Sequence, residues 1–446
     1  MAKENLRNLA LDVVMEVLEK KGFSNQVLGS VLAKYQYLEK QERGFITRLS
    51  LGTIENTILL DEIINTYSKT KTKKMKPVIR NILRLSVYQV YFMDSVPESA
   101  VVNEAVKLAK KRGMAGLSGF VNGVLRSLIR EEKPLADFQN NLSTTYSCPQ
   151  WMIDLWEKDY GKEKTKEILD GFTGNKGLSI RVNLSKITAF QLKEKLEAEG
   201  VKVLPTSLPY GFSIDGFDYL EKLQSFRDGL FYVQDISSMQ VAETADIKGG
   251  EKILDMCAAP GGKSLHMAEK LVICERESDG ENKPFDNKEA GTVEARDLTM
   301  EKVSRIEENI RRTGLSNVST KVWDALQFDE SAKEQYDIVV CDLPCSGLGV
   351  LGKKPEIKYR VSEEDIDALA KLQRDILKNG AAYVKSGGRL IFSTCTVNKK
   401  ENDENTDWFG AEFPEYSLLS KEQIFPKKGE CDGFYIAVFE KNSALI

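Results

Sequence analysis

The sequence predicts a multidomain protein with an all-α N-terminal domain, a small α+β accessory module and a C-terminal α/β domain of the Rossmann type. A chain of 446 residues is too long for one hydrophobic core, so two or three domains are expected. Apolar residues recur at helical spacing over about the first 130 residues. From residue 229 onward strands alternate with helices, which is typical of a parallel sheet with helices on both faces.

Residues 1–135 are expected to form a helical domain with its own core. The first helix keeps Leu6, Leu9, Val13 and Val17 on one face. Further helices are expected at 25–35, 39–50, 54–67, 76–93, 100–112 and 117–131. Residues 1–140 hold 22 Lys and Arg against 15 Asp and Glu, a net charge of +7, whereas the rest of the chain carries −11. This asymmetry points to a polyanionic partner, and on charge alone a solvated helical surface fits equally well.

Residues 136–228 are expected to hold a linker and the α+β accessory module. Helices at 151–160 and 162–172 precede short strands and one further helix at 189–199. Arg181, on the alternating strand 179–183, is a candidate contact to a phosphate or a base. The alternative is an ordinary surface residue on an edge strand.

Composition limits the kinds of site that the chain can carry. Seven cysteines without CxxC spacing and a single histidine argue against a bound metal and for reduced thiols, so we expect a cytoplasmic protein. The charged N-terminus lacks a signal-peptide core, and no apolar run approaches the ~20 residues of a membrane span. We expect a monomer. The polar stretch 273–291 has no periodicity and is expected to be a surface insertion without a function.

The C-terminal domain, residues 229–446, is organised around Asp255–Ser264, a glycine-rich turn between a short strand and a helix. Such a turn lets the backbone approach a ligand and directs free N–H groups at it. A P-loop would need glycine five positions before Gly262, where Cys257 stands, and the spaced glycines of a dinucleotide site are also absent. The turn therefore predicts a nucleotide-type site and leaves the ligand open.

Acidic residues at the ends of later strands narrow the choice of ligand. Asp297, at the end of the second strand, is placed to bind both hydroxyls of a ribose, and Asp324, after the third, to accept from an adenine amino group. Asp342 ends the fourth strand and leads into Cys345, and Cys395 follows the fifth. Because the carboxyl ends of such strands meet at one crevice, these thiols are expected where ligand and chemistry lie.

The N-terminal residues resemble the RNA-binding helical domain of the NusB family. The stretches that carry the resemblance are Asn25–Leu28, Arg43–Thr53, Ile82–Gln89, Val102–Val106 and Phe120–Arg126. The resemblance implies that this domain binds RNA.

Residues 145–446 resemble the family of S-adenosylmethionine-dependent RNA 5-methylcytosine methyltransferases. The stretches that carry this resemblance are Cys257–Lys263, Asp342–Gly347, Ser393–Thr396 and Asp432–Phe434. With the NusB-like domain in front, the architecture resembles the bacterial members that act on small-subunit (16S) rRNA. The resemblance implies S-adenosyl-L-methionine as cofactor, held by Cys257, Ala258, Ala259, Pro260, Gly261, Gly262, Lys263, Asp297, Asp324 and Asp342.

The chemistry of carbon 5 explains a need for thiols. This carbon is a poor nucleophile until a thiolate adds to carbon 6, and a base must later remove the carbon-5 proton. The residues alone leave open which cysteine attacks. The resemblance assigns attack to Cys395, release to Cys345 and hydrogen bonding of the cytosine edge to Asp342. Lys354 and Lys358, which follow the Cys345 loop, are expected to contact the RNA backbone.

Two other functions fit parts of the sequence. One is a cytosine methyltransferase that acts on tRNA, because the preference for rRNA rests on the analogy of domain architecture alone. The other is a non-catalytic NusB-like antitermination factor with a decayed enzyme domain. The complete cofactor loop, the three acids and both cysteines argue against a decayed domain.

Overall fold

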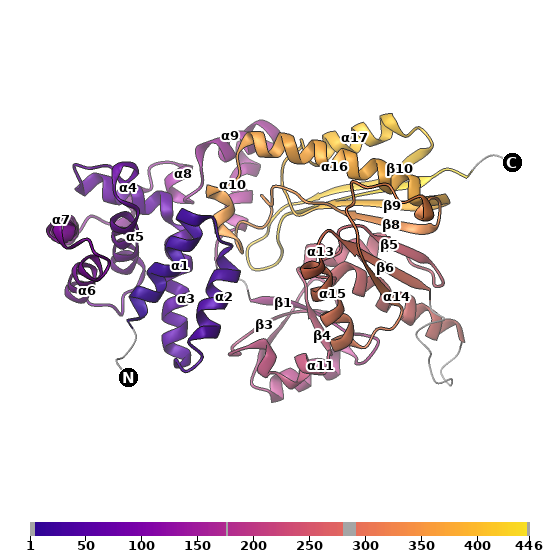
Figure 1. Ribbon diagram of the computed structural model, residues 1–446, viewed down its shortest axis with the longest axis horizontal. Helices are drawn as coiled ribbons and strands as arrows, with labels where there is room; N and C mark the ends of the chain where they lie inside the picture. Colours follow the sequence, from indigo (N-terminus) through magenta and orange to yellow (C-terminus); the bar gives the residue numbers. More distant parts are fainter. Residues whose placement is uncertain (1–4, 175–176, 280–290, 444–446) are drawn as a thin grey trace. The chain divides into compact units, whose positions relative to one another are not determined.

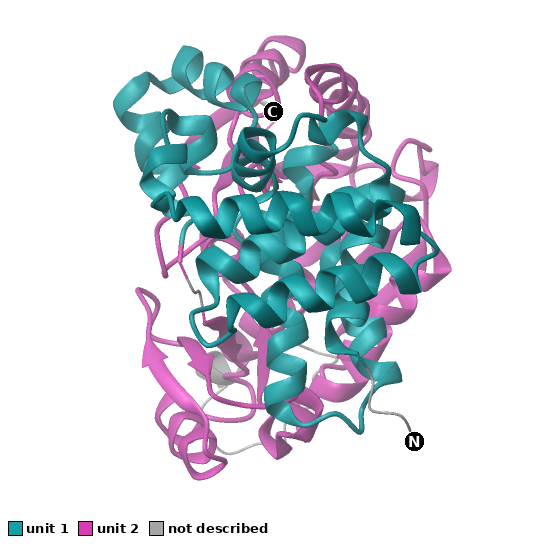
Figure 2. Cartoon of the chain, turned by 90° about the vertical axis from the view of Figure 1, so that its left-hand side faces the viewer, with its two compact units in different colours: residues 1–173, 351–361 teal, residues 174–350, 362–446 magenta. Residues whose placement is uncertain are grey.

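The computed structural model describes residues 5–174, 177–279 and 291–443, and the chain forms two compact units (Figure 2). The first comprises residues 1–173 and 351–361, and the second comprises residues 174–350 and 362–446. Segment 351–361, which interrupts the second unit in sequence, is therefore part of the first. Within the described residues no helix is long and apolar enough to cross a bilayer.

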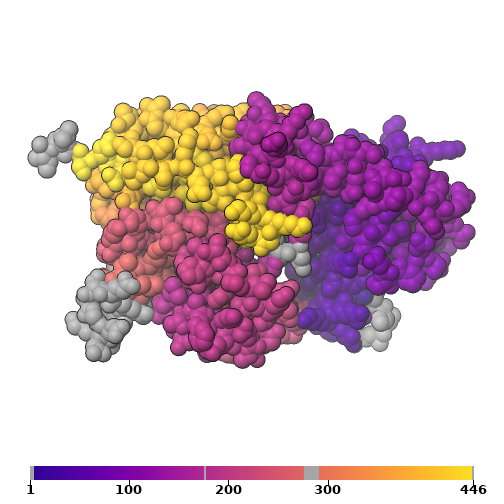
Figure 3. All heavy atoms as spheres, turned by 180° about the vertical axis from the view of Figure 1, so that it is seen from behind, coloured from indigo at the N-terminus to yellow at the C-terminus, as the bar shows by residue number. Residues whose placement is uncertain are grey.

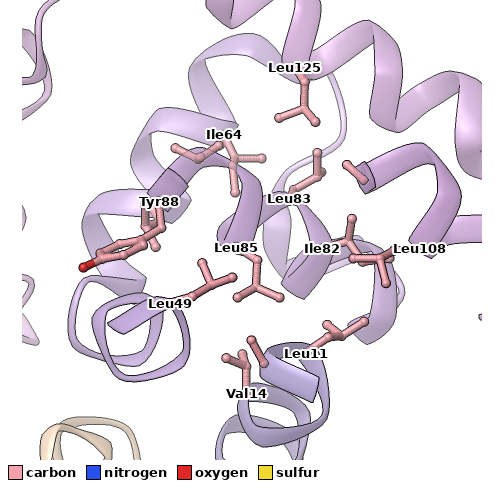
Figure 4. Close-up of a cluster of buried hydrophobic side chains, with 14 of the residues drawn as sticks. Leu11, Val14, Leu49, Ile64, Ile82, Leu83, Leu85, Tyr88, Leu108 and Leu125 are labelled. Carbon is pink, nitrogen blue, oxygen red and sulfur yellow. The ribbon is translucent and has the colours of Figure 1, made fainter. Parts of the chain in front are cut away.

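The first unit is helical throughout, as predicted. Its α-helices are α1 (Leu6–Lys20), α2 (Ser24–Lys34), α3 (Lys40–Glu55), α4 (Thr57–Tyr67), α5 (Pro77–Phe92), α6 (Glu98–Lys111), α7 (Ser118–Glu131), α8 (Leu142–Thr145), α9 (Gln150–Tyr160) and α10 (Lys162–Gly171). The apolar faces of α1, α3, α4, α5, α6 and α7 enclose one core (Figure 4). Helix α5 supplies Ile82, Leu83 and Leu85, each at most 2% exposed, so the other helices pack around it.

Segment 351–361 is held in the first unit by polar contacts. Ser24 donates from its backbone N–H to Glu356 Oε1 (3.0 Å) and from its hydroxyl to Oε2 (2.7 Å). Both residues are buried. Lys358 Nζ donates to the carbonyl oxygen of Glu55 (2.8 Å), and the Arg360 guanidinium lies over the Phe23 ring. A buried carboxylate with two donors explains why this segment packs with the helices.

The second unit holds two sheets (Figure 1). The smaller sheet has the order β2-β3-β1-β4 and is antiparallel; its strands are β1 (Leu178–Val182), β2 (Lys202–Pro205), β3 (Gly211–Asp215) and β4 (Phe231–Val233). Helices α11 (Ala189–Ala198) and α12 (Gln224–Arg227) belong to this module, whose core includes Ile180, Leu192 and Phe231. In the space-filling view, residues late in the chain (yellow) lie against this module (Figure 3). Cys431 forms a small apolar cluster with Ile236, and Leu208 and Tyr210 of the module pack against this cluster.

The larger sheet has seven strands in the order β10-β11-β9-β8-β5-β6-β7. Strands β5 (Lys252–Asp255), β6 (Thr292–Asp297), β7 (Val318–Val322), β8 (Tyr336–Asp342) and β9 (Val384–Thr394) run parallel, whereas β11 (Phe434–Lys441) and β10 (Tyr416–Ile424) extend the β9 edge antiparallel. Helices α13 (Ile236–Thr244), α14 (Gly262–Asp279) and α15 (Met300–Thr313) cover one face, and α16 (Glu363–Tyr383) and α17 (Asp403–Glu412) cover the other. The Rossmann-type prediction is confirmed, with an antiparallel edge added.

Three features of the structure bear on the expected boundaries. Helices α8–α10 pack in the same compact unit as the N-terminal helices. Strand β4 pairs with β1, so the accessory sheet extends past residue 228 to Val233. The polar stretch from 273 was expected to be a loop, but α14 continues to Asp279. Residues 280–290, the remainder of that stretch, lie outside the described residues.

Candidate active site

The glycine-rich turn is fixed between β5 and α14 by contacts with the neighbouring strand. Ala258 N donates to the carbonyl oxygen of Arg296 (2.8 Å), and Ala259 N donates to Asp297 Oδ2 (2.9 Å). Gly261 has φ +102°, a backbone angle that favours glycine, and a Cβ there would lie 3.1 Å from Ile306 Cγ2, a tight contact. The turn therefore keeps its backbone open beside the end of β6.

A cleft of about 390 Å³ opens at the carboxyl ends of β5, β6, β7 and β8. Residues from the turn and from the three acidic strand ends line it together with apolar side chains; they include Cys257, Ala259, Asp297, Leu298, Trp323, Asp324, Leu326, Asp342, Cys345 and Cys395. The volume lies within the range of about 300–1,000 Å³ usual for cofactor sites. The structure thus brings the predicted cofactor acids and both predicted cysteines to one cleft.

The two acids predicted to bind ribose and adenine differ in how many hydrogen bonds and ion pairs their carboxyl groups form within the chain. Asp297 is 4% exposed; it accepts from Leu298 N (2.7 Å) through Oδ1 and pairs with Lys302 Nζ (3.0 Å), in addition to its bond with Ala259. A carboxylate has about four acceptor sites, so capacity remains for a hydroxyl donor. Within the described part of the chain, the carboxyl group of Asp324 accepts one hydrogen bond, from Leu326 N to Oδ1 (3.0 Å). Both acids therefore fit a ligand with hydroxyl and amino donors.

Asp342 joins the cofactor turn to the strand that carries Cys395. Its Oδ2 accepts from Lys263 Nζ (2.7 Å), and its Oδ1 accepts from Ser393 Oγ (2.7 Å). Burial lowers the pKa of Lys263, but the charges of Asp342, Asp255 and Cys395 outweigh burial and raise it overall. Lys263 therefore stays an ammonium, and Cys395 is among the groups that interact with its charge.

The carboxyl group of Asp255 lies beneath the turn. It is fully buried and accepts from Ser264 Oγ (2.6 Å). Burial raises its pKa to about 7. With this contact to the first turn of α14, Asp255 secures the start of the helix that presents Lys263.

The two predicted catalytic thiols lie side by side. Strands β8 and β9 are parallel neighbours with Asp342 opposite Ser393, so the loops that follow them bring Cys345 Sγ to 3.2 Å from Cys395 Sγ. The hydrogen bond with Cys395, followed by burial, raises the pKa of Cys345 well above its usual value. The 3.2 Å separation allows one sulfur to hydrogen-bond the other.

Of the three residues predicted to contact RNA, the structure contradicts two. Arg181 as an RNA contact is wrong: the side chain is fully buried, forms an ion pair with Glu269 and donates to Gln234 Oε1 (2.9 Å). Lys358 is also wrong, because it is 7% exposed and its ammonium is bound to the carbonyl oxygen of Glu55. Lys354 is exposed and stays a prediction.

Two residues that border the thiols, Glu401 and Asn402, were not predicted from the sequence. Both are fully buried, and their side chains contact residues next to Cys345 and Cys395 respectively. Their position in the sequence could have indicated them, because they stand in a polar stretch that follows Cys395. In an ordinary surface turn, such polar residues would be exposed to solvent.

Comparisons with known proteins identify the domains of the chain. Residues 242–440 match the family model for 16S rRNA methyltransferase RsmB/F, residues 4–130 the NusB family, and residues 148–217 the ferredoxin-like domain of RsmF/B-like methyltransferases. "Probable ribosomal RNA small subunit methyltransferase B" of Bacillus subtilis (strain 168) is 36% identical over 96% of this chain and 93% of that protein.

Two further relatives cover nearly the whole chain. Ribosomal RNA small subunit methyltransferase B of Escherichia coli O127:H6 is 28% identical over 98% of both chains. The crystal structure of PH0851 matches with a TM-score of 0.81 and 25% identity, over 98% of this chain and 99% of that one. The domain order and the fold of the helical, accessory and catalytic parts are thereby confirmed, as is S-adenosyl-L-methionine as the cofactor. The chain belongs to the RsmB/F family of 16S rRNA methyltransferases.

Proposed function

We propose that this chain transfers a methyl group from S-adenosyl-L-methionine to carbon 5 of a cytosine in small-subunit rRNA, through a covalent bond between Cys395 and carbon 6. One observation carries the proposal: the two thiols lie 3.2 Å apart at the mouth of the cofactor cleft, beside Asp342. The names of the full-length relatives support small-subunit rRNA over tRNA as substrate.

The cofactor fits the cleft described above. The backbone of the glycine-rich turn, Asp297 and Asp324 would hold it, and Leu298 and Leu326 would supply apolar surface. When bound, S-adenosyl-L-methionine supplies an electrophilic methyl group. A cytosine that enters beside Cys395 must leave its base stack, which is the usual requirement for chemistry on a base.

The arrangement of charges favours Cys395 as the nucleophile. The Lys263 ammonium interacts electrostatically with Cys395, and a nearby cation favours the thiolate form of a cysteine. The hydrogen bond with Cys395 raises the pKa of Cys345. Attack forms the sulfur–carbon 6 bond and moves electron density onto carbon 5. Asp342, already fixed by Lys263 and Ser393, lies where it can hydrogen-bond the base.

Release of the product is assigned to Cys345. Once Cys395 is bonded to carbon 6, the hydrogen bond that raises the pKa of Cys345 is gone. Cys345 can then give up its proton to solvent, and the resulting thiolate accepts the carbon-5 proton as a base. Loss of that proton restores the double bond between carbons 5 and 6 while the carbon–sulfur bond breaks, so the thiolate of Cys395 leaves.

Trapping of the covalent adduct tests the proposal. With rRNA and cofactor present, Cys345→Ala should accumulate a protein–RNA species that survives denaturing gels, whereas Cys395→Ala should form none and should not methylate. Cys148→Ala, a buried cysteine of the helical unit, is the control and should behave like wild type. The opposite pattern would exchange the two roles. Absence of any adduct from Cys345→Ala, with methylation retained by Cys395→Ala, would refute covalent catalysis.

Bisulfite sequencing of RNA from cells with and without the gene identifies the substrate. A cytosine that becomes unprotected in small-subunit rRNA only when the gene is missing supports the proposal. A change confined to tRNA would contradict it.

A further inference from the structure

We propose that the adjacent residues Glu401 and Asn402 are the positioning element of the reaction: Glu401 fixes the Cys345 loop and Asn402 fixes the Cys395 loop, so that together they set the distance between the thiols. This inference rests on the proposed function for its catalytic meaning, whereas its geometric content stands on the structure. Both side chains are fully buried at the start of α17.

Glu401 binds the residue that follows Cys345. Its Oε1 accepts from the backbone N–H of Ser346 (2.9 Å), and its Oε2 accepts from the hydroxyl of Ser346. Gln373, on α16, donates through Nε2 both to Glu401 Oε1 (2.9 Å) and to the carbonyl oxygen of Pro344 (2.9 Å). The two neighbours of Cys345 in sequence are therefore held by one connected pair of side chains.

The acceptor capacity of Glu401 is fully used. Asn398 Nδ2 supplies a fourth donor, to Oε2 (2.7 Å), so each carboxylate oxygen receives two donors. Four donors fill the roughly four lone-pair sites of an ionised carboxylate. An amide at this position would place its NH2 group against two donors, whichever way it pointed.

Asn402 performs the corresponding task for Cys395. Its Oδ1 accepts from Thr394 Oγ1 (2.6 Å), and its Nδ2 donates to the carbonyl oxygen of Thr396 (3.1 Å). These are the two residues that flank Cys395. The Thr396 hydroxyl also contacts the Ser346 hydroxyl (2.7 Å), which links the two loops directly.

The contacts between the Cys345 loop and the Cys395 loop couple the positions of the two thiols. Apart from the side-chain contacts, Gly349 N donates to the carbonyl oxygen of Cys395 (3.1 Å). The charge of Glu401 is also one of the influences that keep Cys345 protonated. Glu401 therefore acts on Cys345 through both its position and its charge.

Site-resolved thiol chemistry on the full-length protein tests the inference. The variants are Glu401→Gln and Asn402→Ala, with Glu404→Gln as the matched control, because Glu404 is exposed on α17, which begins directly after Asn402. Diamide oxidises two adjacent thiols to a disulfide and takes up the two protons and two electrons; peptide mapping then gives the rate of the Cys345–Cys395 cross-link. We expect this rate to fall about tenfold or more in both variants, since a shift of ~1 Å in a reacting group can cost about 100-fold.

Alkylation and kinetics separate positioning from general loss of structure. Glu401→Gln should alter mainly the rate, and its pH profile, of iodoacetamide alkylation at Cys345, and Asn402→Ala mainly that at Cys395. In methylation, kcat should fall while KM for RNA and the Kd for S-adenosylmethionine stay within about twofold. Glu401→Asp, which keeps the charge, should recover part of the loss.

The opposite results would overturn the inference. Wild-type rates of cross-linking and methylation in Glu401→Gln and Asn402→Ala contradict it directly. If Glu401→Gln does not fold, Ser346→Ala, which removes only one donor, must still slow the cross-link, and an unchanged rate in that variant overturns the inference. A Cys345→Ala protein that forms no RNA adduct would instead sink the proposed function, because the cross-linking result does not depend on RNA.

Discussion

Replacement of Arg181 by methionine removes one partner of a buried ion pair and keeps most of the apolar stem. Arg181 on β1 pairs with Glu269 on α14, and neither side chain is more than 2% exposed. The guanidinium also lies 4.3 Å from the centre of the Tyr232 ring. Glu269 in turn accepts from Leu184 N (2.6 Å), so it stays in place when Arg181 is lost.

The expected cost follows from the charge left behind. Removal of one partner of a buried pair typically costs about 3–5 kcal/mol of unfolding free energy, because the other charge stays buried without compensation. For a unit of this size, about 2 °C of melting temperature corresponds to each kcal/mol. The transition of the second unit should therefore fall by roughly 6–10 °C at neutral pH.

The loss should depend on pH in a defined direction. Burial raises the pKa of Glu269 even with Arg181 present, and loss of the guanidinium raises it further. A carboxyl whose folded pKa is raised contributes stability below its unfolded pKa and loses it as pH rises through the folded value. The Arg181→Met variant should consequently be closer to wild type near pH 5 than near pH 8.

Calorimetry of the full chain measures these effects. Lys195→Met, an exposed lysine of the same module, is the control and should shift stability by no more than about 0.5 kcal/mol. The double variant Arg181→Met/Glu269→Met should recover most of the loss, because it removes both charges. A loss below about 1 kcal/mol for Arg181→Met, or the same loss at both pH values, would refute the assignment of the pair as a compensated buried charge.

Three further predictions concern other parts of the chain. Gly261→Ala should weaken cofactor binding in titration calorimetry and cost about 1–3 kcal/mol, because alanine at φ +102° is strained and its Cβ meets Ile306. Ser24→Ala should lower the melting temperature of the helical unit by removing a donor to the buried Glu356 carboxylate, at about 1–3 kcal/mol, and an unchanged transition would contradict the role of that contact. Replacement of the exposed lysines within Lys69–Lys76 by glutamine should reduce the slope of log affinity for RNA against log salt by about 0.7–0.9 per lost phosphate contact, and an unaltered slope would place the RNA contact elsewhere.

The features that the sequence predicted best are those set by local pattern. Helical spacing predicted the helices of the first unit, and the acids at strand ends predicted the cleft, because parallel strands place their carboxyl ends along one edge. The thiol pair followed from the same logic. Their separation of 3.2 Å did not, because it depends on β8 and β9 being neighbours.

Arg181 and Lys358 were wrongly predicted to contact RNA, because their burial depends on partners that are distant in sequence. Arg181 was expected at the surface because charged side chains are seldom buried without a partner, and its partner Glu269 lies 88 residues away. Lys358 was placed on RNA because it stands in a basic run, but its segment packs with the helices and its ammonium binds a carbonyl 303 residues earlier. Charge pattern alone cannot distinguish these cases from a solvated surface.

The order of strands in the large sheet separates the acids of the cleft from its thiols. The acids that suit a ribose and an adenine lie at the ends of β6 and β7, on one side of β5, whereas the thiols follow β8 and β9, on the other. Asp342 ends β8 and accepts hydrogen bonds from Lys263 of the glycine-rich turn and from Ser393 of β9. It therefore lies between the acids on one side of the cleft and the thiols on the other. A methyl donor held on the first side and a base held on the second would meet at that border.

The same topology explains why a two-thiol site needs positioning residues outside the sheet. Backbone pairing aligns β8 and β9 only as far as Asp342 and Ser393. The loops beyond these residues are held by side chains such as Glu401 and Asn402.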